Sequence, residues 1–168
     1  MAATEFFRDE DWAGLAARLT AVAARPAPLR VLVVDDDLLF AELVSVALEL
    51  SDRFEVVGRA ENGRAAIEQA AWVRPDVVVM DIEMPVLGGI DAIPRVLAAA
   101  PGARVVVVSG SQSAEDVVRA RDAGAVGFLS KRESTDELVE AFERVVFRAV
   151  PLRARHSIFD PAERLPMF

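Results

Sequence analysis

Acidic, hydroxyl and amino side chains follow the ends of several short apolar runs in this sequence. Residues 35–37, all aspartates, follow LRVLVV, and Asp81 follows DVVVM. The run ARVVVVS ends in Ser109, and VGFLS is followed by Lys131. Crowded carboxylates repel one another unless a cation neutralises them, and a set of oxygen ligands without His or Cys suits Mg²⁺. With a hydroxyl and an ammonium to bind the other phosphoryl oxygens, such a site could transfer a phosphoryl group onto the carboxylate itself.

Short β-rich runs alternate with helical patterns from residue 29 onward, and this alternation positions those side chains. Strands are predicted at 29–34, 54–60, 76–80, 103–109 and 126–130, and helices at 38–50, 63–73, 90–100, 113–124 and 135–149. This order predicts parallel βαβ units in an α/β fold. We expect a flavodoxin-like, doubly wound, five-stranded parallel sheet of order 2-1-3-4-5, whose ligands bind at the carboxyl ends of the strands.

Several residues have a simpler structural role in this scheme. Asp37 precedes a predicted helix, so an N-cap is favoured over a metal ligand. Gly124 is expected to cap the C-terminus of its helix. Pro94 is expected near the first turn of its helix, where a missing N–H costs little. Thr135, with an acidic residue two positions later, is expected to begin the last helix.

Composition excludes some classes of function. The chain has 168 residues, 53% of them hydrophobic, no cysteine and a formal net charge of −8. The acidic balance argues against a nucleic-acid or anionic-membrane surface, and no apolar run approaches the roughly 20 residues of a membrane span. The acidic, aromatic N-terminus does not match a signal peptide, so a cytoplasmic protein is expected.

Two flanking segments remain outside the alternating pattern. Residues 1–28 are predicted to form an amphipathic helix followed by a proline-containing linker, because Trp12, Leu15, Leu19 and Val22 recur at helical spacing. Residues 29–149 form the predicted α/β domain, and residues 150–168 a C-terminal tail. The apolar side of the first segment could cover the domain or bind a partner. His156, the only histidine, is expected on the surface of the tail.

Four segments together resemble the signatures of response-regulator receiver domains: VLVVDDD, VVVMDIEMPVLGG, VVVVSG and GFLSK. The resemblance covers residues 29 to 149, with every segment in order. It is closest to the NarL-type branch, because Arg132 follows the lysine where many receivers have proline. Relatives in that branch usually carry a DNA-binding domain after the receiver, and the roughly 20 residues that remain here are too few for one.

The resemblance implies a role for each matching position. Asp81 would be the phosphoacceptor, with Ser109 and Lys131 binding the phosphoryl group. Asp35, Asp36, Asp81 and the carbonyl of Glu83 would hold Mg²⁺. Ser109 and Phe128 would be the residues that move when the domain is phosphorylated.

The implied function is a signalling switch. It would accept a phosphoryl group from a histidine kinase or phosphotransfer protein and act through a protein partner or a homodimer. We expect no enzymatic activity beyond its own phosphorylation and dephosphorylation. Two alternatives stay open: a receiver piece of a longer DNA-binding transcriptional regulator, and a phosphohydrolase of the haloacid-dehalogenase type, in which Glu83 would stand at the general-acid position.

Overall fold

The computed structural model describes residues 27–111 and 113–148. The predicted N-terminal helix, the C-terminal tail and His156 lie outside these residues. The strands are β1 (Leu29–Val34), β2 (Phe54–Ala60), β3 (Val77–Met80), β4 (Arg104–Ser109) and β5 (Gly127–Ser130). The helices are α2 (Leu38–Leu50), α3 (Gly63–Val73), α4 (Gly89–Ala99), α5 (Ala114–Ala123) and α6 (Thr135–Arg148). Every predicted strand and helix in this range is present, within one residue at each end.

The five strands form one parallel sheet of order β2-β1-β3-β4-β5, which confirms the predicted topology. The side chains of β3 are buried at all four positions, as are the last four of β1 and the last five of β4. Strands covered on both faces are apolar along their length rather than alternating. This explains why the sequence shows continuous runs of valine.

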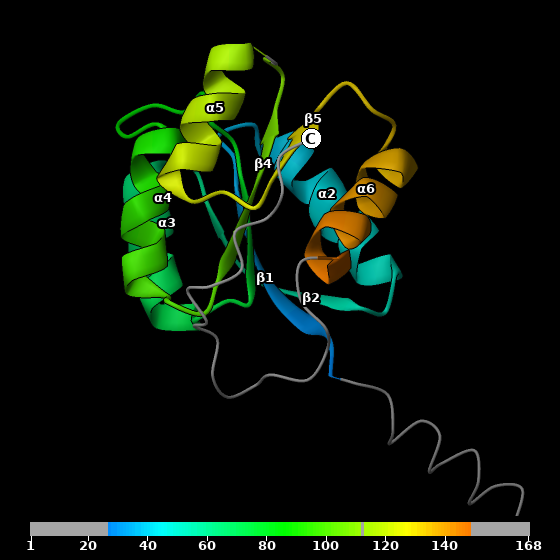
Figure 1. Ribbon diagram of the computed structural model, residues 1–168. Helices are drawn as coiled ribbons and strands as arrows, with labels where there is room; N and C mark the ends of the chain where they lie inside the picture. Colours follow the sequence, from blue (N-terminus) through cyan, green and yellow to red (C-terminus); the bar gives the residue numbers. More distant parts are fainter. Residues whose placement is uncertain (1–26, 112, 149–168) are drawn as a thin grey trace, which may run out of the picture.

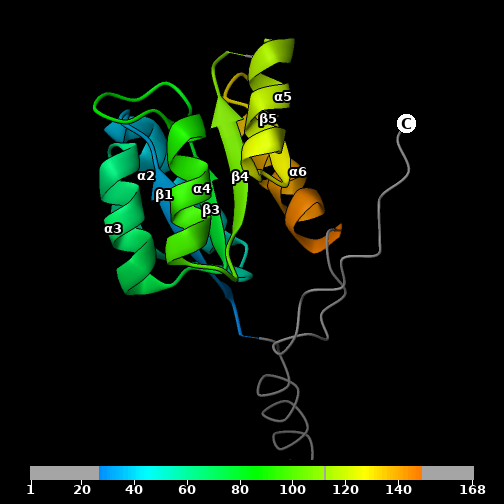
Figure 2. The same ribbon diagram turned by 60° about the vertical axis from the view of Figure 1, so that its left-hand side comes forward.

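Helices cover both faces of the sheet in three layers (Figures 1 and 2). On one face, α3, α4 and α5 pack over a cluster that includes Leu32, Met80 and Ile93. On the other, α2 and α6 pack over a cluster that includes Phe54, Val79 and Phe142. Alternate residues of each strand supply the two clusters because successive side chains of a strand point to opposite faces.

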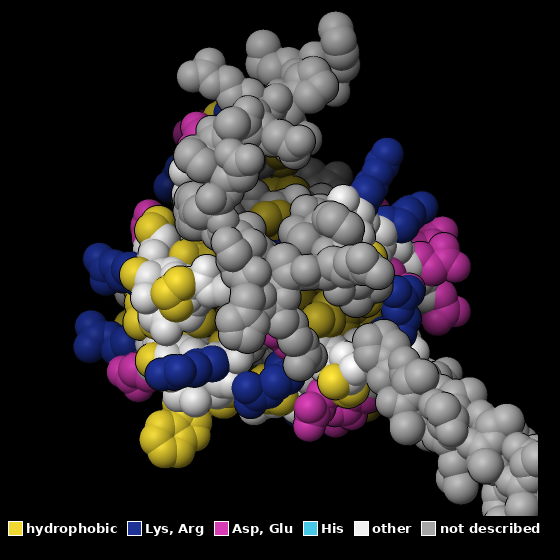
Figure 3. Space-filling view, turned by 60° about the horizontal axis from the view of Figure 1, so that its bottom comes forward, with side chains coloured by type: hydrophobic (Ala, Val, Ile, Leu, Met, Phe, Trp, Pro, Cys, Tyr) yellow, Lys and Arg dark blue, Asp and Glu magenta, His cyan; other side chains and the backbone are white. Residues whose placement is uncertain are grey.

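On the face seen in Figure 3, basic side chains lie on both sides of the view beside acidic ones. Among the described residues, no helix is long and apolar enough to cross a membrane.

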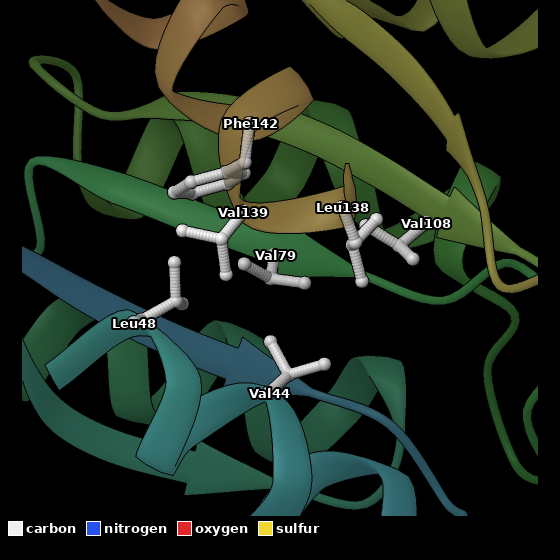
Figure 4. A pocket seen from close by; sticks show the side chains of 7 residues that line it. All are labelled: Val44, Leu48, Val79, Val108, Leu138, Val139 and Phe142. Carbon is white, nitrogen blue, oxygen red and sulfur yellow. The ribbon is translucent and has the colours of Figure 1, made fainter. Parts of the chain in front are cut away.

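A small cavity remains where α2 and α6 face each other above the sheet. Its volume is about 10 Å³, and Figure 4 shows side chains from both helices pointing into it above β3 and β4. The lining residues are all apolar: Val44, Leu48, Val79, Val108, Leu138, Val139 and Phe142. A space of this size without polar partners does not hold an ordered water, so this is a packing gap and not a ligand site.

The helix ends confirm three expectations and correct one. Gly124 caps the C-terminus of α5 in the left-handed conformation, with a φ of 110°. Asp37 caps α2, accepting hydrogen bonds from the backbone N–H groups of Leu39 and Phe40. Helix α6 begins at Thr135 with acidic residues in its first turn, as expected. Its N-cap is Ser134, which forms a reciprocal capping box with Glu137. Pro94 is the sixth residue of α4 and therefore lies in the second turn, where its ring removes one helical hydrogen bond.

Candidate functional site

The strand register brings the predicted site residues to one edge of the sheet. Val34 pairs with Met80 across β1 and β3, and the N–H of Asp81 donates to the carbonyl of Val34 at 2.9 Å. Ser109 pairs with Ser130 across β4 and β5, so Lys131 follows directly at the same edge. Carboxyl ends of adjacent parallel strands therefore deliver the acids and the amine to one place, as predicted from the sequence.

Lys131 joins two of the acids directly. Its ammonium nitrogen lies 2.6 Å from Oδ2 of Asp35 and 2.9 Å from Oδ2 of Asp81. Both carboxylates are buried, and the lysine side chain is only 18% exposed. The other oxygen of each acid accepts a backbone N–H, from Asp37 to Asp35 at 2.9 Å and from Ile82 to Asp81 at 2.7 Å. Each buried charge thus has both an opposite charge and a hydrogen-bond donor, which buried ions require.

Burial and charge act against each other on the ionisation of this cluster. Burial raises the pKa of Asp35, and the hydrogen bonds from Lys131 and from the Asp37 backbone oppose the rise. Burial would lower the pKa of Lys131, but its hydrogen bonds to Asp35 and Asp81 and their negative charges outweigh that effect and raise it. The lysine therefore remains protonated at neutral pH and is a permanent cation in the site.

A third carboxylate, Asp36, faces the other two, and together they fit a hard divalent cation. Oxygens of Asp35, Asp36 and Asp81 all lie within 4.8 Å of one another. Asp35 and Asp81 are buried and Asp36 is exposed, so the set is open to solvent on one side. Three oxygen donors with room for water match the preference of Mg²⁺. Asp37 is occupied in capping α2 and does not belong to this set.

The loop after β3 is shaped by a glycine and by an unusual valine. A Cβ on Gly89 would lie 1.9 Å from the carbonyl oxygen of Asp81, so the start of α4 can approach the acidic edge only with glycine there. Val86 has a positive φ of 69°, a conformation that a β-branched residue rarely adopts. The side chain of Val86 is 77% exposed, so packing does not explain this backbone. Glu83, in the same loop, is exposed, and its N–H lies 3.5 Å from Oδ1 of Asp81.

Ser109 and Phe128, the predicted moving residues, lie on neighbouring strands. Ser109 is fully buried, and its hydroxyl accepts the backbone N–H of Ser111 at 3.1 Å. Its carbonyl accepts the N–H of Lys131 at 2.9 Å, so β4 and the lysine are directly connected. Phe128 is half-buried, pairs with Val107 and packs against the cluster beneath α3, α4 and α5.

Sequence reasoning missed two features of Lys131. It is the only lysine in the chain, which has no tyrosine and no cysteine either. All other basic residues are arginines, apart from one histidine. The single lysine could therefore have been recognised from the sequence as an unusual position. The ammonium also lies 4.7 Å from the centre of the Phe40 ring, a cation–π contact that places α2 beside the site and that no motif predicts.

Comparison with known proteins agrees with this geometry. Residues 31–143 match the family model described as the response regulator receiver domain. The chain belongs to the response regulator receiver family. This membership confirms the resemblance drawn from the four signature segments, and it favours a phosphoacceptor over a haloacid-dehalogenase phosphohydrolase.

Solved receiver domains have the same fold as this receiver. The receiver domain of the putative response regulator NarL from Mycobacterium tuberculosis is 36% identical, with a TM-score of 0.67 over 72% of this chain and 98% of that one. The response regulator domain of Thermotoga maritima CheB is 31% identical, with a TM-score of 0.65 over 73% of this chain and 96% of that one. The similarity therefore includes the NarL-type branch, as expected.

Curated relatives of this receiver carry the name of an enzyme. The protein-glutamate methylesterase/protein-glutamine glutaminase of Pseudoalteromonas translucida is 47% identical over 62% of this chain and 27% of its own length. That of Vibrio parahaemolyticus is 38% identical over 80% of this chain and 38% of its own length. The chain thus spans about a third of the length of these relatives.

These names correct one expectation. The sequence led us to expect a domain with no enzymatic activity beyond its own phosphorylation, whereas proteins up to 47% identical to it are named as enzymes. The receiver signatures could not reveal this, because they describe only the phosphoryl site. An enzymatic activity in another part of a relative cannot be detected from the residues at the strand ends of its receiver.

Proposed function

We propose that this receiver is a phosphorylation-dependent signalling switch whose phosphoacceptor is Asp81. The observation that supports this most is the position of one protonated lysine between Asp35 and Asp81, at 2.6 and 2.9 Å. A cation there would meet the oxygens of a phosphoryl group attached to Asp81 and hold them in place. The switch would consist of residues 29–149, flanked by segments 1–28 and 150–168.

The donor in this proposal is a phosphohistidine of a histidine kinase or a phosphotransfer protein. A carboxylate oxygen of Asp81 attacks the phosphorus, a P–O bond forms, and the N–P bond breaks with its electron pair going to the imidazole. The products are an aspartyl phosphate and a histidine that takes a proton from solvent. Lys131 and the hydroxyl of Ser109 bind phosphoryl oxygens, and hydrolysis by water resets the domain. We infer that this chemistry takes place in the cytoplasm.

Mg²⁺ fits the acidic set and would be held by Asp35, Asp36, Asp81 and the carbonyl of Glu83. When bound, it would neutralise the charge that builds up on the phosphoryl oxygens during transfer. The remaining functions belong to side chains: Asp81 supplies the nucleophile, Lys131 holds charge, and Gly89 lets α4 approach the acceptor.

Labelling with a small acyl phosphate tests the proposal. Acetyl phosphate carrying radioactive phosphate should label the chain only with Mg²⁺ present, and hydroxylamine should remove the label because it cleaves acyl phosphates. A label that persists for at least seconds supports a switch. Continuous release of phosphate without an accumulated label would instead indicate a phosphohydrolase and contradict the proposal.

The curated relatives support a more specific output. We propose that phosphorylation of this receiver controls a protein-glutamate methylesterase, through protein contacts and without direct binding to nucleic acid. The specific observation is the 47% identity to a protein of that name. The test adds the phosphorylated receiver, or its Asp81→Asn variant, to the esterase portion of the Vibrio parahaemolyticus relative and measures methanol release from a methyl-esterified protein. Equal rates with both would contradict this output.

A further inference from the structure

The ring of Phe40 lies beside the lysine of the acidic edge. The ammonium of Lys131 is over this ring, 4.7 Å from its centre, which is within the range of a cation–π contact. Phe40 is the third residue of α2, and its side chain is half-buried against the cluster beneath α2 and α6. Leu129, two residues before Lys131, packs against the same cluster. The ring and the lysine are therefore both held on this face of the sheet.

A closed loop of contacts sets the position of the ring. Lys131 contacts Oδ2 of Asp35 at 2.6 Å, and Oδ1 of Asp35 accepts the backbone N–H of Asp37 at 2.9 Å. Oδ1 of Asp37 in turn accepts the backbone N–H of Phe40 at 3.1 Å, and the ring of Phe40 meets the ammonium. The cap of α2 thus fixes the backbone of Phe40 relative to the same acid that binds the lysine.

The ring contact differs in kind from the two ion pairs of the lysine. An ammonium has three N–H donors, and Asp35 and Asp81 accept two of them. Both acids also belong to the set that fits Mg²⁺, and Asp81 is the proposed phosphoacceptor, so both would change partners during a cycle of phosphorylation. Phe40 has no charge and offers no oxygen to a metal. Its contact with the ammonium would therefore persist while the two ion pairs change.

The ring also limits where the lysine side chain can lie. Lysine is a flexible side chain with considerable rotamer freedom, so ion pairs that change during the cycle would not keep it in one conformation. The side chain of Lys131 is only 18% exposed, and a cation–π contact is stronger where water is excluded from the cation. Without the ring, the ammonium could turn toward the space that Phe40 now fills.

We propose that Phe40 is a positioning residue for phosphoryl transfer, whose ring holds the ammonium of Lys131 at the acidic edge while Asp35 and Asp81 change partners. Phe40 acts through the lysine and not on the phosphoryl group directly. The effect on transfer rests on the proposed function, whereas the contact itself does not. A cation–π contact of a poorly solvated ammonium corresponds to about a three- to tenfold change in a rate or equilibrium constant, so a partial loss is expected when the ring is removed.

Nuclear magnetic resonance tests the contact in the full chain without phosphorylation. Lysine labelled with ¹³C at Cε gives one signal, because Lys131 is the only lysine, and protons over the face of an aromatic ring resonate upfield. We expect the Cε protons of Lys131 to lie upfield of those of free lysine. Phe40→Tyr keeps a ring and should retain this position, whereas Phe40→Leu should move the signal toward that of free lysine.

Phe147→Leu is the matched control. Phe147 is also half-buried against the cluster beneath α2 and α6, and the guanidinium of Arg53 lies 3.7 Å from the centre of its ring. It contacts the ring of Phe54 at the start of β2, the opposite end of the sheet from the acids. The control therefore removes similar packing and a similar cation–π contact, and it should not change the signal of Lys131.

Phosphorylation by acetyl phosphate in the presence of Mg²⁺ tests the effect on transfer. The limiting rate of Phe40→Leu should be about three- to tenfold below that of the wild type. Its half-saturating concentration should stay close to the wild-type value, because the lysine acts mainly as the phosphoryl group becomes bonded to Asp81. Phe40→Tyr and Phe147→Leu should both show nearly the wild-type limiting rate.

The outcomes distinguish this proposal from the proposed function. An unlabelled wild type would contradict the proposed function, and with it any role of Phe40 in transfer. A labelled wild type with an equal rate in Phe40→Leu would overturn only the role of Phe40, as would a Lys131 signal that Phe40→Leu does not move. A rate as low in Phe40→Tyr as in Phe40→Leu would also overturn it, because the ring itself would then not be the cause.

Discussion

The ammonium of Lys131 lies closer to Asp35, at 2.6 Å, than to Asp81, at 2.9 Å. Asp35 thus positions the lysine by a contact that does not involve the proposed acceptor. A phosphoryl group on Asp81 would change one of the two ion pairs of Lys131 and leave the other in place. This arrangement would keep the cation in the site throughout the proposed cycle of phosphorylation and hydrolysis.

Asp81→Asn should abolish phosphorylation while the domain remains folded. The amide has nearly the same size as the carboxylate but cannot act as the nucleophile, and removal of one charge relieves repulsion with Asp35 and Asp36. Labelling by acetyl phosphate with Mg²⁺ measures the effect, and circular dichroism checks the fold. Asp91→Asn, at an exposed acid in the first turn of α4, is the control and should label normally. Labelling of Asp81→Asn at the wild-type level would contradict the assignment.

Asp36→Asn should weaken Mg²⁺ binding much more than Asp37→Asn. Asp36 belongs to the acidic set, whereas Asp37 caps α2, and asparagine caps a helix as well as aspartate does. Isothermal titration should show that Asp36→Asn loses at least the roughly 10- to 100-fold in Mg²⁺ affinity that is typical of changes outside the ligand shell. The pair is matched in position and chemistry, so equal losses would mean that the wrong acid has been assigned to the metal.

The ion pairs of Lys131 should stabilise the metal-free domain up to alkaline pH. Its folded pKa is raised above 10.5, so the folded state binds the proton more tightly than the unfolded state does. The stabilisation is complete below pH 10.5 and is lost as the pH rises through the folded pKa. With no tyrosine, no cysteine and one lysine in the chain, this is the only side chain expected to titrate there, because arginine stays protonated.

Thermal melts with a chelator measure this effect. The melting temperature of the wild type should fall between about pH 10 and pH 12, and that of Lys131→Met should be lower at pH 9 but nearly constant over the same range. The signal of lysine labelled with ¹³C at Cε reports the pKa directly, because only one such signal exists. A folded pKa below 10.5 would contradict this account of the site.

The sequence predicts that Asp35, Asp81 and Lys131 meet at one edge of the sheet, because strand ends determine where they lie. The end of a continuous apolar run shows where a parallel strand ends. The next residue then lies at the carboxyl edge of the sheet, where ligands bind. Asp35, Asp81 and Lys131 could therefore be assigned to this edge from the sequence. The start of the last helix at Thr135 was predicted correctly, but its N-cap was not identified, since Ser134 and Thr135 are adjacent residues of similar chemistry and only hydrogen bonds distinguish them. The exposure of Leu39 and the positive φ of Val86 could not be predicted, because both run against the usual preference of the residue type: leucine is commonly buried, and a β-branched residue rarely has a positive φ.

Val86→Asn should stabilise the domain by about 1 kcal/mol. Its φ of 69° costs a β-branched residue of the order of 1 kcal/mol or more, whereas asparagine adopts this region readily. The side chain is 77% exposed, so little packing is lost. Urea unfolding measures the difference. Val126→Asn, at a 45% exposed valine with ordinary backbone, should give no gain, and an equal gain there would exclude backbone strain as the cause.

The effect of phosphorylation should spread from Asp81 to the surface formed by α5, β5 and α6. A phosphoryl group adds about −1.5 to −2 charges, and Ser109 and Lys131 are the groups that can respond. A shift of Ser109 toward the phosphoryl would move the loop that leads into α5, and Phe128 on the adjacent strand could then turn inward. Arg119, Arg121 and Glu137 lie on the surface that would change.

Beryllofluoride, which mimics the phosphoryl group, tests this path in the presence of Mg²⁺. We expect changes in backbone amide chemical shifts that reach residues 114–147, and a reduced effect in Ser109→Ala. Moving the domain from almost entirely inactive to almost entirely active requires the bound mimic to favour the active conformation by about 5.5 kcal/mol. Peaks at intermediate positions would indicate a smaller free-energy preference for the active conformation. Asp81→Asn is the control and should not respond. Changes confined to residues next to Asp35, Asp81 and Lys131 would show that the site binds the mimic without switching the domain.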